Sequence, residues 1–377
     1  MDISSEMIHA ILPAFLVSLG ASMALIGLIE GLSEGAVAVT KVFSGAISDW
    51  LGKRKLLAVI GYALGALSKP VFALAVTPFE VLGARFADRV GKGIRGAPRD
   101  ALVADITPPA VRGAAYGLRQ SLDTVGAFAG PLLAMALLAW MTDDPRTVFW
   151  LAVIPGGIAV LLLMLGVEEP RRGSAEAIPR AAISWSSWRT LNARYWAVVA
   201  VGVVFTLARF SEAFLILRGQ EVGLSLALLP AILIVMNVVY AATALPAGSL
   251  SDRINRGILL AASLCVLILA DCVLAFWSGV AGVLVGVALW GLHMGLSQGL
   301  LAALVADTSP QALRGTAFGV FNLLSGATVF VASLIAGVLW ESFGSSSTFL
   351  AGAGFSAVAL VGLVVLAAMR KGAASPS

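Results

Sequence analysis

Ionisable side chains lie within stretches of sequence that are otherwise apolar. Arg85, Asp88, Arg89 and Lys92 follow i, i+3/i+4, i+7 spacing, so a helix would place all four on one face. Each charge inside a membrane costs about 2.5–3.5 kcal/mol even on the lenient insertion scale. Burying many such groups unpaired would be prohibitive, so we expect them to pair across helices or to line a wet cavity.

Three carboxylates are candidates for reversible proton binding: Glu6, Glu34 and Asp123. Desolvation favours a neutral carboxyl group, and a nearby guanidinium group favours the charged one. An arginine that approaches in only one conformation would make protonation depend on conformation, and Arg89 is the best-placed partner. Structural ion pairing is the alternative role for these groups. The expected cavity lining adds Glu30, Lys69, Arg85, Asp88, Lys92, Arg119, Glu212, Asp271 and His293.

The elements that must position these residues are membrane helices. Of 377 residues, 59% are apolar and 12% charged, whereas soluble domains average about 45–50% and about 25%. A membrane helix needs roughly 20 apolar residues. Twelve apolar segments fit that length with their connections, at 7–20, 22–46, 56–77, 79–105, 113–141, 147–167, 196–217, 223–247, 257–278, 281–306, 315–340 and 347–369.

A polar linker over residues 168–195 separates an N-terminal half (1–167) from a C-terminal half (196–377). Outside the linker, basic residues concentrate in alternate connections and at the C-terminal end: Lys53, Arg54, Lys55, Arg253, Arg256, Arg370 and Lys371. The positive-inside rule therefore predicts that the linker and both termini are cytoplasmic, in a multi-pass protein of the cytoplasmic (inner) membrane. The same distribution explains the net charge of +4 without a nucleic-acid partner.

The two halves repeat. Ala101–Asp105, followed by Arg112-Gly113 and Gly117, reappears at an offset of 202 as Ala303–Asp307, Arg314-Gly315 and Gly319. A second motif, Gly45–Asp49, reappears at an offset of 203 as Gly248–Asp252. Lys69 and Asp271 hold equivalent places in the two halves, at the offset of 202. A parallel duplication of six helices with a substrate site between the halves is a transporter architecture.

The two halves differ in charge. The 79–105 segment has at least five charged residues, whereas the equivalent 281–306 segment offers only His293 and Gln298 as interior polar candidates. We therefore expect proton and charge handling in the N-terminal half and an apolar substrate wall in the C-terminal half. Ser5-Glu6 matches Ser211-Glu212, which places the start of the first helix near mid-membrane. This predicts a start further upstream or a truncated first helix.

The stretch Gly45-Ala-Ile-Ser-Asp49-Trp50-Leu-Gly52-Lys53-Arg54 resembles the signature cytoplasmic loop of the major facilitator superfamily. Trp50 departs from that pattern, and Asn255 replaces a glycine in the second copy. The resemblance covers the whole chain and implies an all-α integral membrane fold of about twelve helices in two pseudo-symmetric six-helix bundles. The implied cytoplasmic gate comprises Gly45, Asp49, Gly52, Lys53, Arg54, Arg99, Arg112, Asp252, Arg253 and Arg314.

Gly117, Gly126, Gly130 and Pro131 match the superfamily's antiporter motif, although Ala134 replaces a further glycine. The resemblance implies a proton-coupled exporter working by alternating access, which takes a small molecule or ion as substrate and acts as a monomer. A proton symporter or a facilitated uniporter remains open. So does a divalent metal cation exporter, since the 91–102 run is loosely similar to nickel-resistance permeases. We expect no enzymatic activity and no cofactor, because the sequence has no Walker motif and no His-Glu-x-x-His.

Overall fold

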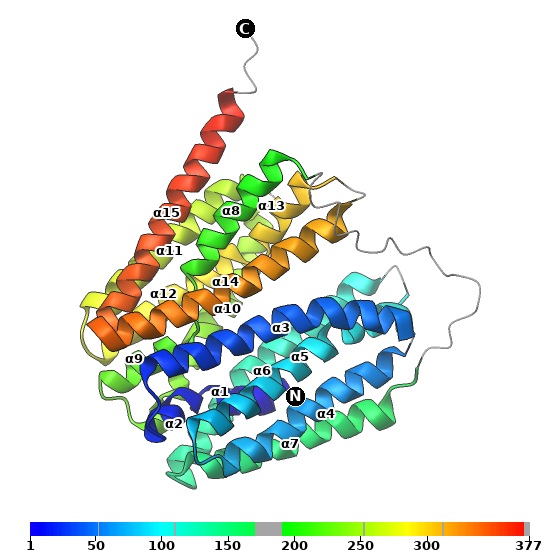
Figure 1. The fold of residues 1–377 in the computed structure, drawn as a ribbon, viewed down its shortest axis with the longest axis vertical. Helices are drawn as coiled ribbons and strands as arrows, with labels where there is room; N and C mark the ends of the chain where they lie inside the picture. The colour runs from blue at the N-terminus through cyan, green and yellow to red at the C-terminus, as the bar shows by residue number, and fades with distance from the viewer. Residues whose placement is uncertain (52, 109–110, 170–190, 252, 311–312, 373–377) are drawn as a thin grey trace.

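The computed structural model describes residues 1–51, 53–108, 111–169, 191–251, 253–310 and 313–372, and these ranges contain helices and no strand (Figure 1). The elements are α1 (Asp2–His9), α2 (Leu12–Ser18), α3 (Met23–Leu51), α4 (Arg54–Leu74), α5 (Pro78–Ile106), α6 (Arg112–Trp140), α7 (Pro145–Gly166), α8 (Ala193–Leu207), α9 (Ala213–Glu221), η3 (Leu226–Leu228), α10 (Pro230–Ser251), α11 (Arg256–Phe276), α12 (Val280–Ser297), α13 (Leu300–Thr308), α14 (Arg314–Phe343) and α15 (Ser345–Gly372).

The helices form two groups that agree with an all-α membrane fold. In the first group α5 packs on α3 and α4, while α1 packs on α6 and α7. In the second group α12 packs on α10 and α11, while α15 packs on α8, α11 and α14. Within the described ranges, 9 spans are long and apolar enough to cross a membrane. Three expected segments fall outside that set, because α5 is rich in charge and the α1–α2 and α8–α9 segments are interrupted.

Two ends of the molecule can be distinguished. Helices α3, α5, α7, α10 and α13 end, and α4, α6, α8, α11 and α14 begin, at the same end of the molecule. We call this end the linker side and the opposite end the far side. Most of the linker, residues 170–190, lies outside the described residues.

Three of the expected apolar segments are each divided into two helices: 7–20, which divides into α1 and α2, 196–217 and 281–306. The 196–217 segment divides into α8 and α9, with Ala208–Glu212 between them. The Ser211 hydroxyl accepts a hydrogen bond from Ala213 N at 3.2 Å and so caps the second piece. The 281–306 segment divides into α12 and α13 at Gly299, which has a φ of +72°. Glycine adopts this left-handed conformation readily because it has no β-carbon. These segments therefore cross the structure as pairs of shorter helices.

The two groups meet along α3 and α14, which run side by side in Figure 1. Glycines make this approach possible: a β-carbon on Gly31 would lie 2.7 Å from the carbonyl oxygen of Phe330. A β-carbon on Gly27 or Gly337 would collide with the backbone carbonyl of Ser333 or Met23, respectively. Backbone therefore contacts backbone from the far side of the interface toward its middle, as small residues allow in membrane proteins.

Candidate functional site

A cavity of about 420 Å³ lies between the two halves. We call it the central cavity. The N-terminal half contributes Glu6, His9, Glu34, Arg89, Lys92 and Ala127. The C-terminal half contributes Thr206, Arg209, Phe210, Ser211, Glu212, Asn237, Trp290 and Val329. Polar groups of both signs and two aromatic rings therefore face one space at the boundary of the halves.

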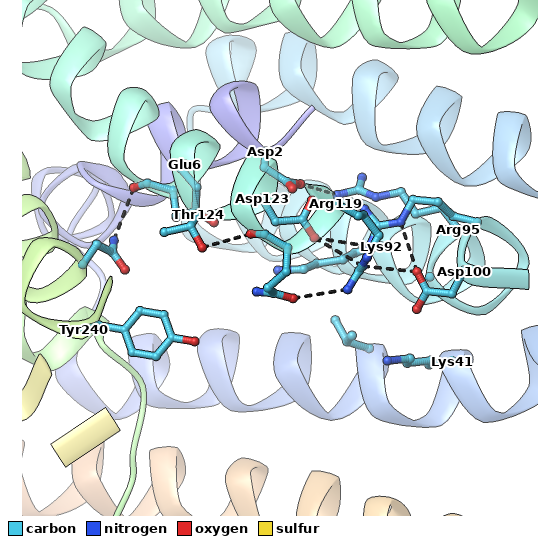
Figure 2. A pocket seen from close by; sticks show the side chains of 16 residues that line it. Asp2, Glu6, Lys41, Lys92, Arg95, Asp100, Arg119, Asp123, Thr124 and Tyr240 are labelled. Carbon is cyan, nitrogen blue, oxygen red and sulfur yellow. Dashed lines mark hydrogen bonds and ion pairs between the residues drawn. The ribbon is translucent and has the colours of Figure 1, made fainter. Parts of the chain in front are cut away.

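A second cavity of about 320 Å³ adjoins the first toward the linker side, and Glu6 and Lys92 line both. Figure 2 shows its acidic and basic side chains gathered along one wall, with Lys41 and Tyr240 across from them. Asp123 lies between two arginines, with Oδ2 3.3 Å from Arg119 Nη1 and 3.5 Å from Arg99 Nη2. Arg119 also pairs with Asp100 at 3.1 Å, so these groups form one network.

The charged face of α5 makes ion pairs with neighbouring helices. A capping box between Thr77 and Glu80 starts the helix on the far side. Arg85 Nη2 lies 2.9 Å from Glu30 Oε2 of α3, and both side chains are buried. Lys69 Nζ of α4 lies 2.6 Å from Asp88 Oδ1, and both are buried. Pairing at these distances offsets the cost of burying the charges.

One helical turn closer to the linker side, Arg89 Nη2 lies 3.3 Å from Glu34 Oε1. Arg89 is 2% exposed and Glu34 is 35% exposed, so the carboxylate is the accessible member of the pair. His9 lies beside them: Arg85 and Arg89 each direct an Nη2 group at His9 Nδ1, at 3.4 and 3.3 Å. Because both guanidinium groups can only donate, Nδ1 accepts and the neutral ring carries its proton on Nε2.

His9 was not predicted from the sequence, and neither were Asn237 and Trp290 in the cavity wall. One available signal was that His9 follows Glu6 by three residues and therefore shares its helix face. For Asn237 and Trp290 the signal was weak, because each stands alone in an apolar segment.

Several residues expected to line the cavity lie behind its wall instead. Of the predicted residues, Glu6, Glu34, Arg89, Lys92 and Glu212 line the central cavity, and Arg119 and Asp123 line the second cavity. The residues placed behind the wall are Glu30, Lys69, Arg85, Asp88, Asp271 and His293. Four of these are held there by the ion pairs of α5. His293 donates its Nδ1 proton to the carbonyl oxygen of Ser263 at 2.8 Å.

Asp271 differs from its repeat-related partner. Lys69 pairs with Asp88, whereas both oxygens of the fully buried Asp271 have no hydrogen-bond partner within the described part of the chain. The residue equivalent to Asp88 at an offset of 202 is Trp290, an indole that faces the central cavity. At these equivalent positions the N-terminal half therefore has an ion pair, whereas the C-terminal half has a buried carboxyl group and an aromatic side chain of the cavity wall.

The glycines of the α6 motif lie against α1. A β-carbon on Gly130 would lie 2.8 Å from the carbonyl oxygen of Ile3, and one on Gly126 would lie 3.0 Å from the β-carbon of Asp2. Pro131 is buried beside them. Gly117 has open space around it. The two central glycines therefore set the distance between α6 and the helix that carries Glu6 and His9.

On the linker side the repeat is preserved in two ion pairs. Arg54 pairs with Asp105, and Arg256 Nη1 pairs with Asp307 Oδ2 at 2.6 Å, each residue displaced by 202 from its counterpart. Arg112 donates from Nε to the carbonyl oxygens of Ala104 and Thr107 at the end of α5.

The other predicted gate residues differ in how far the structure describes them. Lys53 and Arg253 are exposed. Gly45 lies beside α5, where a β-carbon would lie 3.5 Å from that of Ala97. Gly52, Asp252 and the side chains of Asp49 and Arg314 lie outside the described residues. Arg99 takes part in the Asp123 network of the second cavity.

Two repeat-related helical halves around a polar cavity define a membrane transport protein. The chain belongs to the Major Facilitator Superfamily, whose family model matches residues 1–237 and 210–377. It is 31% identical over 372 residues to an MFS-type transporter of Methanocaldococcus jannaschii, covering 97% of this chain and 91% of that one. The expected fold class and family are therefore confirmed.

Two further comparisons are more distant. The chain is 31% identical over 147 residues to the multidrug resistance protein MdtH of Proteus mirabilis, which covers 39% of this chain and 35% of that one. The crystal structure of the nucleoside transporter NupG superposes with a TM-score of 0.74 at 14% identity, covering 97% of each chain. At that identity the likeness establishes the fold alone.

Proposed function

We propose that the protein exports a small solute across the cytoplasmic membrane in exchange for protons, as a monomer working by alternating access. The linker side and both termini face the cytoplasm in this proposal, as the basic connections of the sequence indicate. The two halves rock about the α3–α14 contact and expose the central cavity to each side in turn. One proton moving inward across 100 mV supplies about 2.3 kcal/mol for this work.

The observation that carries the proposal is the Glu34–Arg89 pair. A proton carrier must reach the solvent, and Glu34 is the partly exposed member of its pair. Its charged form is stabilised by a guanidinium group that is itself fixed by burial and by His9. A cationic group of the solute that approaches Glu34 would compete with the proton for this carboxylate, so the two would bind in turn, as exchange requires.

The α6 glycines support exchange rather than cotransport because, with Pro131, they match the superfamily's antiporter motif. Gly126 and Gly130 bring α6 against the helix that carries Glu6, a second candidate carboxylate of the same cavity. Asp123, the third candidate, lies on α6 itself between Arg99 and Arg119. The partial likeness to a multidrug resistance protein agrees with export. A divalent metal cation has less support, because the described residues contain no group of three or more His, Cys, Asp or Glu side chains arranged to hold one.

Everted membrane vesicles test the proposal. Respiration acidifies the lumen, a pH-sensitive dye reports it, and panels of divalent metals, organic anions, zwitterions and lipophilic cations are added outside. We expect one class to cause protein-dependent alkalinisation of the lumen. Glu34→Gln should abolish this response, and Asp143→Asn, a control in the exposed far-side connection, should retain it.

Three results would contradict the proposal. A proton-coupled response that survives Glu34→Gln removes Glu34 from the coupling step. Solute uptake into vesicles without an energy source, together with no proton response from any panel, assigns the protein to facilitated uniport. Uptake accompanied by acidification of the lumen assigns it to symport.

A further inference from the structure

The charged groups of the central cavity divide into paired and unpaired sets. Arg89 and Glu34 form an ion pair. Lys92, Arg209 and Glu212 have no ion-pair partner within 4.0 Å in the part of the chain that the structure describes, and the one contact of this kind for Glu6 is His9 at 3.8 Å. The wall therefore presents two cations and two carboxylates whose partners must come from water or from a bound molecule.

The unpaired groups come from both halves. Lys92 belongs to α5 of the N-terminal half, and Arg209 belongs to the break between α8 and α9 of the C-terminal half. The guanidinium carbon of Arg209 lies 5.9 Å from the centroid of the Phe205 ring. That aromatic contact leaves the hydrogen-bond donors of Arg209 available. Glu212 is the last residue of the break, directly before α9, and it also lines the central cavity.

The cavity has no excess of either sign. Glu6, Glu34 and Glu212 supply three negative charges, and Arg89, Lys92 and Arg209 supply three positive ones. His9 is neutral in the hydrogen-bonding arrangement described above. A ligand with a net charge would leave one wall group without a partner of opposite charge, whereas a ligand with one charge of each sign would not.

An aromatic corner completes the wall. The rings of Phe210 and Trp290 have centroids 5.2 Å apart and both line the cavity. Phe210 is held from behind by Phe214 and Phe349, with centroids 5.7 Å away in each case. The corner is therefore a rigid apolar surface next to Arg209 and Glu212, suited to an aromatic or branched apolar group.

We propose that the central cavity binds a small zwitterion with an apolar body, an inference that rests on this cavity being the substrate site of the proposed function. The anionic group of the ligand lies between Lys92 and Arg209, the cationic group faces Glu212 and Glu6, and the body packs on Phe210 and Trp290. A volume of about 420 Å³ limits the ligand to the size of an amino acid or a short peptide. Because its anion contacts both halves, the ligand joins them when it binds.

Binding to the purified full chain in detergent, with no proton gradient, tests the inference. The probes are L-tryptophan and the dipeptide Phe-Ala as zwitterions, tryptophanamide as the cation and indole-3-propionate as the anion. We expect thermal stabilisation by at least one zwitterion and none by the singly charged analogues. Arg209→Met, Lys92→Met and Glu212→Gln should each weaken the affinity at least about tenfold. Lys55→Met, a lysine at the start of α4 that lines neither cavity, should leave it unchanged.

The inference is overturned if a singly charged analogue binds as tightly as the zwitterions, if no zwitterion binds, or if the three variants bind with the affinity of the unaltered protein. Melting profiles without ligand show that each variant is folded. The vesicle assay separates the two proposals. Zwitterion binding without proton exchange contradicts antiport alone, and proton exchange driven only by singly charged solutes contradicts the zwitterion site alone.

Discussion

The hydroxyl group of Ser211 donates a hydrogen bond to Glu30 Oε2 at 3.1 Å, across the boundary between the two halves. The same carboxylate oxygen pairs with Arg85 of its own half, and the backbone N–H of Ser211 donates to Ser333 Oγ at 3.2 Å. Glu30 precedes Glu34 by one helical turn and lies on its far side. This contact therefore links the two halves on the far side of the central cavity, and opening of the far side in the proposed transport cycle would have to break it.

Replacing Ser211 with alanine should favour the conformation that is open on the far side. A hydrogen bond to a charged group contributes about 1.5–3 kcal/mol, so the population ratio should change by tenfold or more. Spin labels on cysteines placed at Asp143 and Ser278, with Cys265 and Cys272 replaced by alanine, measure the far-side distance. Ser346→Ala, whose hydroxyl bonds within one half, should leave the distance distribution unchanged. An unchanged distribution in Ser211→Ala would show that the link does not hold the far side closed.

Replacing His9 with alanine should impair proton-coupled transport. Two guanidinium groups lose the acceptor they share, and Arg89 is no longer fixed opposite Glu34. We expect at least a tenfold loss of rate in the vesicle assay, with partial recovery in His9→Gln, whose amide oxygen can accept both donors. Equal losses in the two variants would mean that the ring packs in a structural role only.

The repeat-related residues Lys69 and Asp271 should respond in opposite ways to apolar substitution. Lys69→Met leaves Asp88 buried without its partner, which costs about 3–5 kcal/mol, and the double variant with Asp88→Leu should recover most of that loss. Asp271→Leu removes an unpaired buried carboxyl group and should raise the melting temperature. Melting curves of the detergent-solubilised protein measure both. A fall in melting temperature for Asp271→Leu would indicate that this carboxyl group has a stabilising partner.

Replacing Gly130 with alanine should weaken the contact between α1 and α6. The added methyl group would meet the backbone of Ile3 and the β-carbon of Glu6, and overpacking of this kind costs about 1–3 kcal/mol. Gly117→Ala is the matched control on the same helix, because that glycine has open space beside it. Melting temperature and transport rate should fall in Gly130→Ala and stay unchanged in Gly117→Ala. Equal behaviour would mean that α1 shifts without cost.

Much of the fold was predictable because the constraints act locally. Segment length and apolar content predict membrane helices, and the spacing of Arg85, Asp88, Arg89 and Lys92 places them on one face of α5. The common offset of about 202 predicts that Arg54 and Arg256 have equivalent surroundings. Both properties follow from the chain itself and need no knowledge of which helices touch.

The pairing of charges across helices was not predictable, because it depends on which helices touch. Glu30 and Lys69 have many possible partners, and the choice of Arg85 and Asp88 depends on how α3 and α4 cross α5. The interruption at Ala208–Glu212 was hidden because the residues on either side are apolar, so hydropathy gives no boundary. His9 is one residue among several polar ones near the start of the chain, and its importance appears only when two arginines of α5 meet its ring.

The glycine contact between α3 and α14 has a mechanical consequence. It runs from the far-side ends of these two long helices toward their middle, so in the proposed rocking motion it would act as a fulcrum with its shorter arm on the far side. With a rise of about 1.5 Å per residue, Gly27 lies about 24 Å from Phe43, and a rotation of about 10° displaces that end of α3 by roughly 4 Å. A single methyl group added at the fulcrum would therefore alter the width of the opposite opening by more than its own size.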